Sequence, residues 1–301
     1  MHLKSIPMNN ILVPTDFSEC ANHATDVAVL LAKISGAKVH LLTSLPLPYH
    51  WSAMPEKERA KYKMAQGDIR QAERLLEGKR KKHESISMEI SWADSDLLKN
   101  ISEYVYQYSI DLIVMGSHGV GGKNDLFIGS TTQKVVRAVH CPVLIIKNPL
   151  EKLDFKKVIF ASDFQIEELP VFELFLDFIK MFSPEIHFVA IRSSAFQESE
   201  KSIKAAILPF KQLCDSLPYK AHVFKYFDVS GGIQAFAKKI GADLIAISNH
   251  QRHPLKRMLF GSNVELIVNY ANAPVLTLDF EENKPDAVSK GKGAQLVDII
   301  L

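Results

Sequence analysis

Short apolar runs alternate with longer amphipathic stretches along the first half of the chain. Residues 11–14 and 38–45 are apolar runs of strand length, and small and aliphatic residues recur at helical spacing between them. Ser18 is a typical helix N-cap and Gly36 a typical helix stop. The pattern therefore predicts a strand, an acidic turn at Asp16, a helix and a second strand.

The same alternation continues to the end of the apolar pattern near residue 280. Further strands are expected over 86–92, 112–115, 143–146, 158–161, 186–191, 221–227 and 273–278, and helices over about 58–82, 94–108, 130–140, 170–182, 198–217 and 232–240. Strands that alternate with helices pair in parallel through right-handed crossovers. An α/β fold with doubly wound parallel sheets is expected.

The second half of the chain repeats landmarks of the first. Val158-Ile-Phe-Ala-Ser-Asp-Phe164 echoes Ile11-Leu-Val-Pro-Thr-Asp-Phe17, and Ala273-Pro-Val-Leu echoes Cys141-Pro-Val-Leu. We therefore expect two tandem domains, 1–150 and 151–281. Residues 282–301 are rich in polar residues, Pro and Gly and are expected to form a mobile tail.

Composition narrows the class of protein. The 301 residues are 47% hydrophobic and 23% charged, as in soluble globular proteins with a substantial core. A net charge of +2 gives no electrostatic footprint for nucleic acid or an anionic membrane, and no apolar run reaches membrane-spanning length. The three cysteines lack metal-binding or disulfide spacing, so a cytoplasmic location is expected.

A glycine loop follows the apolar run 112–115 and leads into a helix. Gly116, Gly119 and Gly129 allow sharp turns and close backbone approach, and Ser130 is expected to cap the helix. Free N–H groups at a helix N-terminus attract phosphate. The spacing matches neither a Walker A loop nor the dinucleotide fingerprint, and a glycine loop can also be only a turn. Because ligands bind at the carboxyl ends of parallel strands, Asp16 should meet this loop.

The loop, together with Gly129-Ser130 and the following Cys141-Pro-Val-Leu-Ile-Ile146, resembles the ATP-binding type of universal stress protein. The resemblance implies two five-stranded sheets of order 3-2-1-4-5, paired through their last strands as an intrachain pseudo-dimer. It also implies ATP, with or without Mg²⁺, as the ligand. The residues that it places around the nucleotide are Thr15, Asp16, Ser44, Met115, Gly116, His118, Gly119, Gly129, Ser130 and Thr131.

The roles implied by that resemblance differ along the nucleotide. Asp16 would lie near the ribose and the metal-bound phosphates, with Thr15 beside it, and Gly116 near the ribose. Ser44 and Met115 would border the adenine, although both are also ordinary strand-end packing residues. The phosphates would meet Gly119, Gly129 and Ser130, with Thr131 adjoining, and His118 is either a phosphate contact or an exposed loop histidine.

The second copy of the loop departs from the pattern. Ser248 and Gln251 stand where the first copy has Gly116 and Gly119, so ATP is expected to bind there weakly or not at all. Five basic residues crowd this loop and fit either another anion or a solvated interface: His250, Arg252, His253, Lys256 and Arg257.

Three functions remain open on sequence alone. The first is an ATP-binding regulatory protein of the stress response, with at most slow hydrolysis, that acts on an unknown protein partner. The second is an enzyme, either an ATPase or a nucleotidyl transferase, supported only by analogy of fold. The third is a nucleotide-independent scaffold with a vestigial glycine loop. Association of two chains as a homodimer is also left open.

Overall fold

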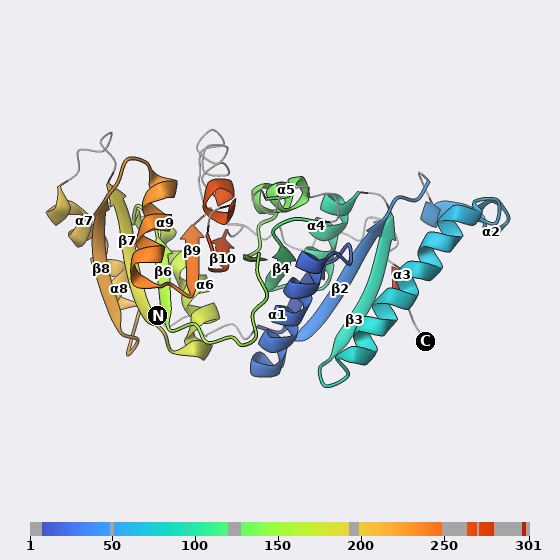
Figure 1. The fold of residues 1–301 in the computed structure, drawn as a ribbon, viewed down its shortest axis with the longest axis horizontal. Helices are drawn as coiled ribbons and strands as arrows, with labels where there is room; N and C mark the ends of the chain where they lie inside the picture. The colour runs from blue at the N-terminus through green and yellow to red at the C-terminus, as the bar shows by residue number, and fades with distance from the viewer. Residues whose placement is uncertain are drawn as a thin grey trace.

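A single mixed sheet runs the length of the molecule. The computed structural model describes residues 8–48, 51–94, 96–119, 128–192, 199–248, 264–269, 271–279 and 297–298. In this part of the chain eleven strands are hydrogen-bonded in the order β11-β3-β2-β1-β4-β5-β10-β9-β6-β7-β8. Figure 1 shows the blue-to-green first half beside the yellow-to-red second half, with helices packed against the strands.

The first half contains strands of order 3-2-1-4-5, as expected. Its elements are β1 Asn10–Pro14, α1 Glu19–Ser35, β2 Lys38–Leu45, η1 Trp51–Ala53, α2 Glu56–Arg59, α3 Lys63–Lys82, β3 Met88–Asp94, α4 Leu97–Gln107, β4 Leu112–Gly116, α5 Ser130–Ala138 and β5 Val143–Ile146. Ser18 caps α1 by accepting a hydrogen bond from the Ala21 N–H, and Gly36 ends it with φ 77°. The predicted boundaries of α1 are confirmed.

The second half has the same strand order relative to its own first strand. Its elements are β6 Lys157–Ala161, η2 Ile166–Glu168, α6 Leu169–Ile179, η3 Lys180–Phe182, β7 Glu185–Arg192, α7 Glu200–Ala206, α8 Leu208–Gln212, β8 Tyr219–Lys225, α9 Val229–Ile240, β9 Leu244–Ser248, β10 Val275–Leu278 and β11 Val297–Asp298. A further helical segment covers residues 264–269.

Two helices predicted as continuous are interrupted. The stretch expected over 58–82 divides into α2 and α3, because Tyr62 leaves the helical backbone and packs its ring 6.1 Å from that of Trp51. The stretch expected over 198–217 divides into α7 and α8, because Pro209 has no amide hydrogen and stands in the first turn of α8.

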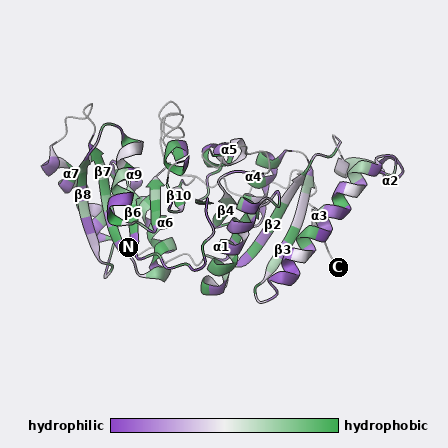
Figure 2. Cartoon of the chain, in the orientation of Figure 1, coloured by the Kyte–Doolittle hydropathy of each residue, from purple (hydrophilic) through white to green (hydrophobic). Residues whose placement is uncertain are grey.

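Alternating side chains of the strands build a core on each face of the sheet. Ile11 and Val13 join α1, α3, α6 and α8 in one hydrophobic cluster. Leu12, between them, points to the other cluster with α4, α5, α9 and the segment 264–269. Figure 2 shows the hydrophobic residues, in green, concentrated in the central strands, whereas α2 and α3 carry long purple stretches.

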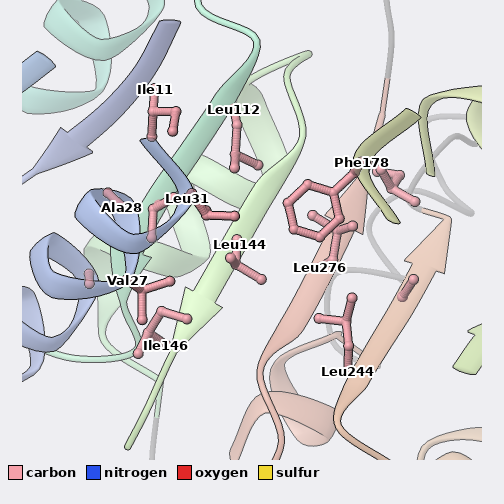
Figure 3. Close-up of a cluster of buried hydrophobic side chains, with 14 of the residues drawn as sticks. Ile11, Val27, Ala28, Leu31, Leu112, Leu144, Ile146, Phe178, Leu244 and Leu276 are labelled. Carbon is pink, nitrogen blue, oxygen red and sulfur yellow. The ribbon is translucent and has the colours of Figure 1, made fainter. Parts of the chain in front are cut away.

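The halves join where β5 pairs antiparallel with β10. Leu276 lies opposite Leu144 in the register of this pair. Both side chains are fully buried, and Figure 3 shows them on one face of the sheet with Ile146 and Phe178 nearby. The expected meeting of residues 143–147 with 275–278 within one chain is confirmed, and the apolar cluster is continuous across the seam.

Only two residues of the predicted tail are described. Val297–Asp298 form β11, which pairs antiparallel with Trp92 and Ser91 of β3 at one edge of the sheet. Residues 280–296 and 299–301 lie outside the described part of the chain. Among the described residues, none of the helices combines the length and the apolar character that crossing a bilayer requires.

Candidate functional site

The turn after β1 presents Asp16 at the carboxyl edge of the sheet. The Thr15 N–H donates to the Leu42 carbonyl at 2.8 Å, and the Phe17 N–H donates to Thr15 Oγ1 at 3.0 Å. Phe17 has φ 62°, so the chain reverses sharply into α1. Thr15 is buried by this arrangement, whereas Asp16 is exposed and accepts a hydrogen bond from the Ser18 N–H.

The loop after β4 brings Gly119 against the Asp16 carboxylate. A β-carbon on Gly119 would overlap Asp16 Oδ2 and lie 3.3 Å from Asp16 Cγ. Two stretches about a hundred residues apart therefore meet at one point, as the parallel topology predicts. Any larger residue at position 119 would displace the carboxylate.

Gly129 closes the far side of the same loop. Its N–H donates to the Ser117 carbonyl at 2.7 Å, and a β-carbon would lie 3.2 Å from His118 Cα and 3.7 Å from the Gly119 nitrogen. His118 is half-buried, and its Nδ1 lies 2.9 Å from Ser117 Oγ. Asp16, Gly119, His118 and Gly129 therefore form one contiguous group.

The helix N-cap is Gly129, and the prediction that Ser130 caps α5 is wrong. Ser130 is the first helical residue, and Gly129 has no side chain with which to cap the first turn. Ser130 and Thr131 are both exposed. The N–H groups of a first turn without a side-chain cap favour an anion, so this helix N-terminus is well suited to a phosphate.

Gly116 and Met115 have strong packing roles in this fold. A β-carbon on Gly116 would lie 2.9 Å from the Cys20 backbone carbon, so glycine lets α1 approach β4 closely. Met115 is buried in the hydrophobic cluster formed by α4, α5 and α9. Neither observation assigns these residues to a nucleotide, and their predicted adenine and ribose contacts stay predictions.

Ser44 provides a polar atom that its surroundings leave unsatisfied. It lies at the end of β2, next to β1 in the sheet. Its Oγ is shielded from solvent and makes no hydrogen bond to the described residues. A buried hydroxyl of this kind usually has a partner, and a ligand would supply one.

Ser117 is a site residue that the motif analysis did not single out. It is 2% exposed, its carbonyl accepts from Gly129, and its hydroxyl contacts His118 and Cys20. Its position inside the glycine motif was the sequence signal that could have identified it.

The three cysteines are buried and free, and burial raises the pKa of Cys141 and Cys214.

The corresponding corner of the second half has a different chemistry. Phe164 repeats the positive φ of Phe17, and its N–H donates to Ser162 Oγ at 2.7 Å. Ser162 in turn donates to Glu168, which is 4% exposed and lies beside the buried Ser248. Burial, and then the nearby Asp163 carboxylate, raise the pKa of Glu168 to about 7.

Several predicted residues of the second loop lie outside the described residues. They are Gln251 and the basic residues His250, Arg252, His253, Lys256 and Arg257. Ser248 is described, and it ends β9 at the position that Gly116 has in β4. A hydroxyl side chain therefore stands at the strand end where the first half has glycine, and the buried carboxyl group of Glu168 lies beside it.

Known proteins resemble this chain over about half or nearly all of its length. A universal stress protein of Thermus aquaticus is 30% identical over 138 residues, which is 46% of this chain and 97% of the relative. One from Methanocaldococcus jannaschii is 25% identical over 147 residues, covering 46% of this chain and 82% of the relative. A crystal structure from Archaeoglobus fulgidus, also a universal stress protein, covers 91% of this chain and 97% of its own at 19% identity, with TM-score 0.71.

The Archaeoglobus structure shares the fold of nearly the whole chain. The family model for the Universal stress protein family matches residues 8–147 and 222–278, and these two segments make up more than half of the chain. The matched segments include both strand-end turns of the first half and the β8–β10 region of the second. The chain belongs to the universal stress protein family.

Proposed function

We propose that this protein is an ATP-binding regulatory protein whose nucleotide site lies in the first half. The observation that carries the proposal is the meeting of Asp16 with Gly119 and of Gly119 with Gly129 at the N-terminus of α5. A carboxylate beside Gly119 and Gly129, where β-carbons would crowd their neighbours, next to helix N–H groups without a side-chain cap, suits a metal-bound polyphosphate.

Each part of a nucleotide has a matching group in this proposal. The phosphates would be held by the backbone of Gly119 and Gly129 and by Ser130, with Thr131 adjoining. Asp16, oriented by the turn at Thr15, would serve the ribose and the metal-bound phosphates. The unsatisfied hydroxyl of Ser44 supports an adenine contact at the end of β2.

The second half is proposed to leave ATP unbound. Ser248 adds a side chain at the strand end, and the nearby Glu168 brings a carboxyl group that would repel phosphate when ionised. One nucleotide per chain follows from this difference.

The proposed role is regulation through a protein partner rather than rapid turnover. Phosphoryl transfer needs positioned cations and a group that orients the nucleophile, and the proposal assigns the described site residues to binding. We therefore propose at most slow hydrolysis. Three free, buried thiols are in keeping with the proposed cytoplasmic location.

Thermal unfolding with and without Mg-ATP tests this function. A ligand that binds only the folded chain stabilises it by about 2.7 kcal/mol at a hundred times its dissociation constant. Ser130→Asp should abolish the shift because it puts a negative charge where phosphate would bind, while Asp suits a first helical turn. Ser130→Ala, the matched control, keeps most of the shift. An unshifted wild-type transition would contradict the proposal and favour a nucleotide-independent scaffold.

An enzymatic function is tested by measuring the release of phosphate or pyrophosphate in the same protein preparations. Release of phosphate or pyrophosphate that Asp16→Ala removes would replace the regulatory role with an ATPase or a nucleotidyl transferase. The proposal predicts turnover that is slow or below detection over hours.

A further inference from the structure

Across the β5–β10 seam, Asn269 of the second half binds the backbone segment that leads into Gly129 and α5. The Ile128 N–H donates a hydrogen bond to Asn269 Oδ1, although the two residues are 141 positions apart. Ile128 is 5% exposed and Asn269 is 8% exposed, so the bond is sheltered from water. Ile128 immediately precedes Gly129, the N-cap of α5.

The Ile128 peptide is held on both sides. Gln133 Nε2 donates to the Ile128 carbonyl at 3.3 Å from within α5, while Asn269 accepts from its N–H. Loss of the Asn269 acceptor would leave a buried N–H without its partner, which is costly. The chain would be expected to shift at Ile128, and Gly129 would move with it.

Asn269 is itself fixed to the seam strand. Lys147 follows β5, and its Nζ donates to the Asn269 carbonyl at 2.6 Å. The neighbouring Ile146 carbonyl accepts from the Ser117 N–H at 2.9 Å, which ties the same strand end to the glycine loop. Through Lys147 and Ser117, both Asn269 and the glycine loop are therefore tied to the end of β5.

The first half has a different residue at the position equivalent to Asn269. Alignment of Ile128-Gly-Ser130 with Phe260-Gly-Ser262 places Arg137 at the position of Asn269. Arg137 forms an ion pair with Glu265 across the seam. The asparagine is therefore a feature of the second half that serves the first.

We propose that Asn269 is a positioning residue for the nucleotide site, so that ATP affinity in the first half depends on the seam with the second half. The inference rests on the proposed function for its ligand, but its structural part concerns Ile128 alone. Since coupling between sites is reciprocal, bound nucleotide would in turn favour the seam contact. The degenerate second half then acts as a regulator of the first site.

Hydrogen exchange and Mg-ATP titration of the full chain test the two parts separately. Asn269→Leu removes the acceptor at similar size, Asn269→Asp keeps an acceptor oxygen, and Asn148→Ala removes only an exposed seam bond to the Asn272 carbonyl. Asn269→Leu should speed exchange over residues 128–132 in nucleotide-free protein and weaken Mg-ATP binding about tenfold. Asn269→Asp and Asn148→Ala should stay close to wild type in both measurements.

Unchanged exchange at residues 128–132 in Asn269→Leu would overturn the positioning role, whether or not ATP binds. Unchanged Mg-ATP affinity in that variant, with a wild type that binds, would overturn the coupling and leave the proposed function intact. A wild type that does not bind would overturn the proposed function and the coupling together, while the exchange result still decides the positioning role. Asn269→Ala replaces Asn269→Leu if the leucine variant does not fold.

Discussion

The Asp16 carboxylate fills the space that a side chain on Gly119 would need. A β-carbon at position 119 would overlap Asp16 Oδ2, and Asp16 is an exposed, single-carboxylate side chain that can rotate away. Its displacement should therefore cost little folding free energy but should disturb a site that uses this carboxylate. Gly119 and Asp16 are best understood as one functional unit.

Gly119→Ala is expected to weaken Mg-ATP binding about tenfold while changing the free energy of unfolding by less than about 1 kcal/mol. Equilibrium titration and denaturant unfolding measure the two quantities. Gly78→Ala is the matched control, since Gly78 is exposed within α3 and a β-carbon there meets nothing within 4 Å. It should stabilise the chain by about 0.5–1 kcal/mol and leave binding unchanged. Equal affinity in both variants would argue against a role for the Asp16–Gly119 pair.

Gly116→Ala, in contrast, should act mainly on the free energy of unfolding. The new β-carbon would lie 2.9 Å from the Cys20 backbone carbon and 3.0 Å from its oxygen, and a backbone in a buried helix turn cannot rotate away. Overpacking of this kind costs typically about 1–3 kcal/mol. Urea unfolding should show this loss, and a variant as stable as wild type would mean that α1 can move away from β4 freely.

Glu168 makes stability depend on pH near neutrality. Its pKa is raised from 4.5 to about 7, so the folded chain holds this proton more tightly than the unfolded chain. The contribution is fully present below pH 4.5 and is lost as pH rises through about 7; the difference of about 2.5 pKa units corresponds to roughly 3 kcal/mol. Glu168→Gln cannot ionise and should gain stability relative to wild type between pH 5 and pH 8.

Unfolding curves at several pH values check this expectation for Glu168→Gln. The amide oxygen can still accept from Ser162, so the variant keeps the contact that the structure shows. Parallel stability profiles for variant and wild type across this range would show that Glu168 titrates normally.

A stacked histidine pair in the second half should act at lower pH. His187 Nε2 contacts Glu185 and His187 Nδ1 lies 3.1 Å from His222 Nε2, with the rings against Phe236 of α9. Burial lowers the pKa of both histidines below 6.5, and for His222 the His187 charge adds to the effect. The contribution of the pair to stability is therefore complete above pH 6.5. It falls below that pH because the unfolded histidines bind protons that the folded pair does not, and it is lost once the pH has passed through the lowered pKa values of the folded pair.

Substituting His222 tests the acid sensitivity. His222→Gln removes one titrating group while its amide can still donate to His187 Nδ1. The variant should lose less stability than wild type between pH 6.5 and pH 4.5, as followed by circular dichroism during urea unfolding. The same loss in both proteins would assign the acid sensitivity to other groups, among which Lys220, Lys157, Lys239 and Glu185 also act on the pair.

The sequence predicted those parts of the site that follow from strand order. Asp16 follows β1 and Gly119 lies in the loop after β4. These strands are parallel neighbours, and parallel strands put their carboxyl ends on one edge, so the meeting of the two turns was deducible from the sequence. The β5–β10 seam was deducible only through family resemblance, because no local pattern specifies which strand edges of two sheets will pair. The interruption at Tyr62 accompanies a tertiary contact with Trp51, which no local pattern specifies. The interruption at Pro209 had a signal in the sequence, the proline itself, which the continuous apolar spacing around it obscured.

Contacts across the seam could not be derived from sequence. Asn269 is an ordinary polar residue near the end of a helical segment. It can accept the hydrogen bond from the Ile128 N–H only when β5 and β10 are paired. Glu168 was equally hidden, since its burial depends on how η2 packs over Ser162 and Ser248. Ser130 was misassigned as the cap because Gly129 satisfies the same backbone position without a side chain.

The central claim, one nucleotide site in the first half of each chain, is tested most directly by calorimetric titration of nucleotide-free protein with Mg-ATP. The account predicts one site per chain in wild type and its loss in Ser130→Asp. Two sites per chain would contradict the inference drawn from Ser248 and Glu168, and no binding would contradict the nucleotide function itself.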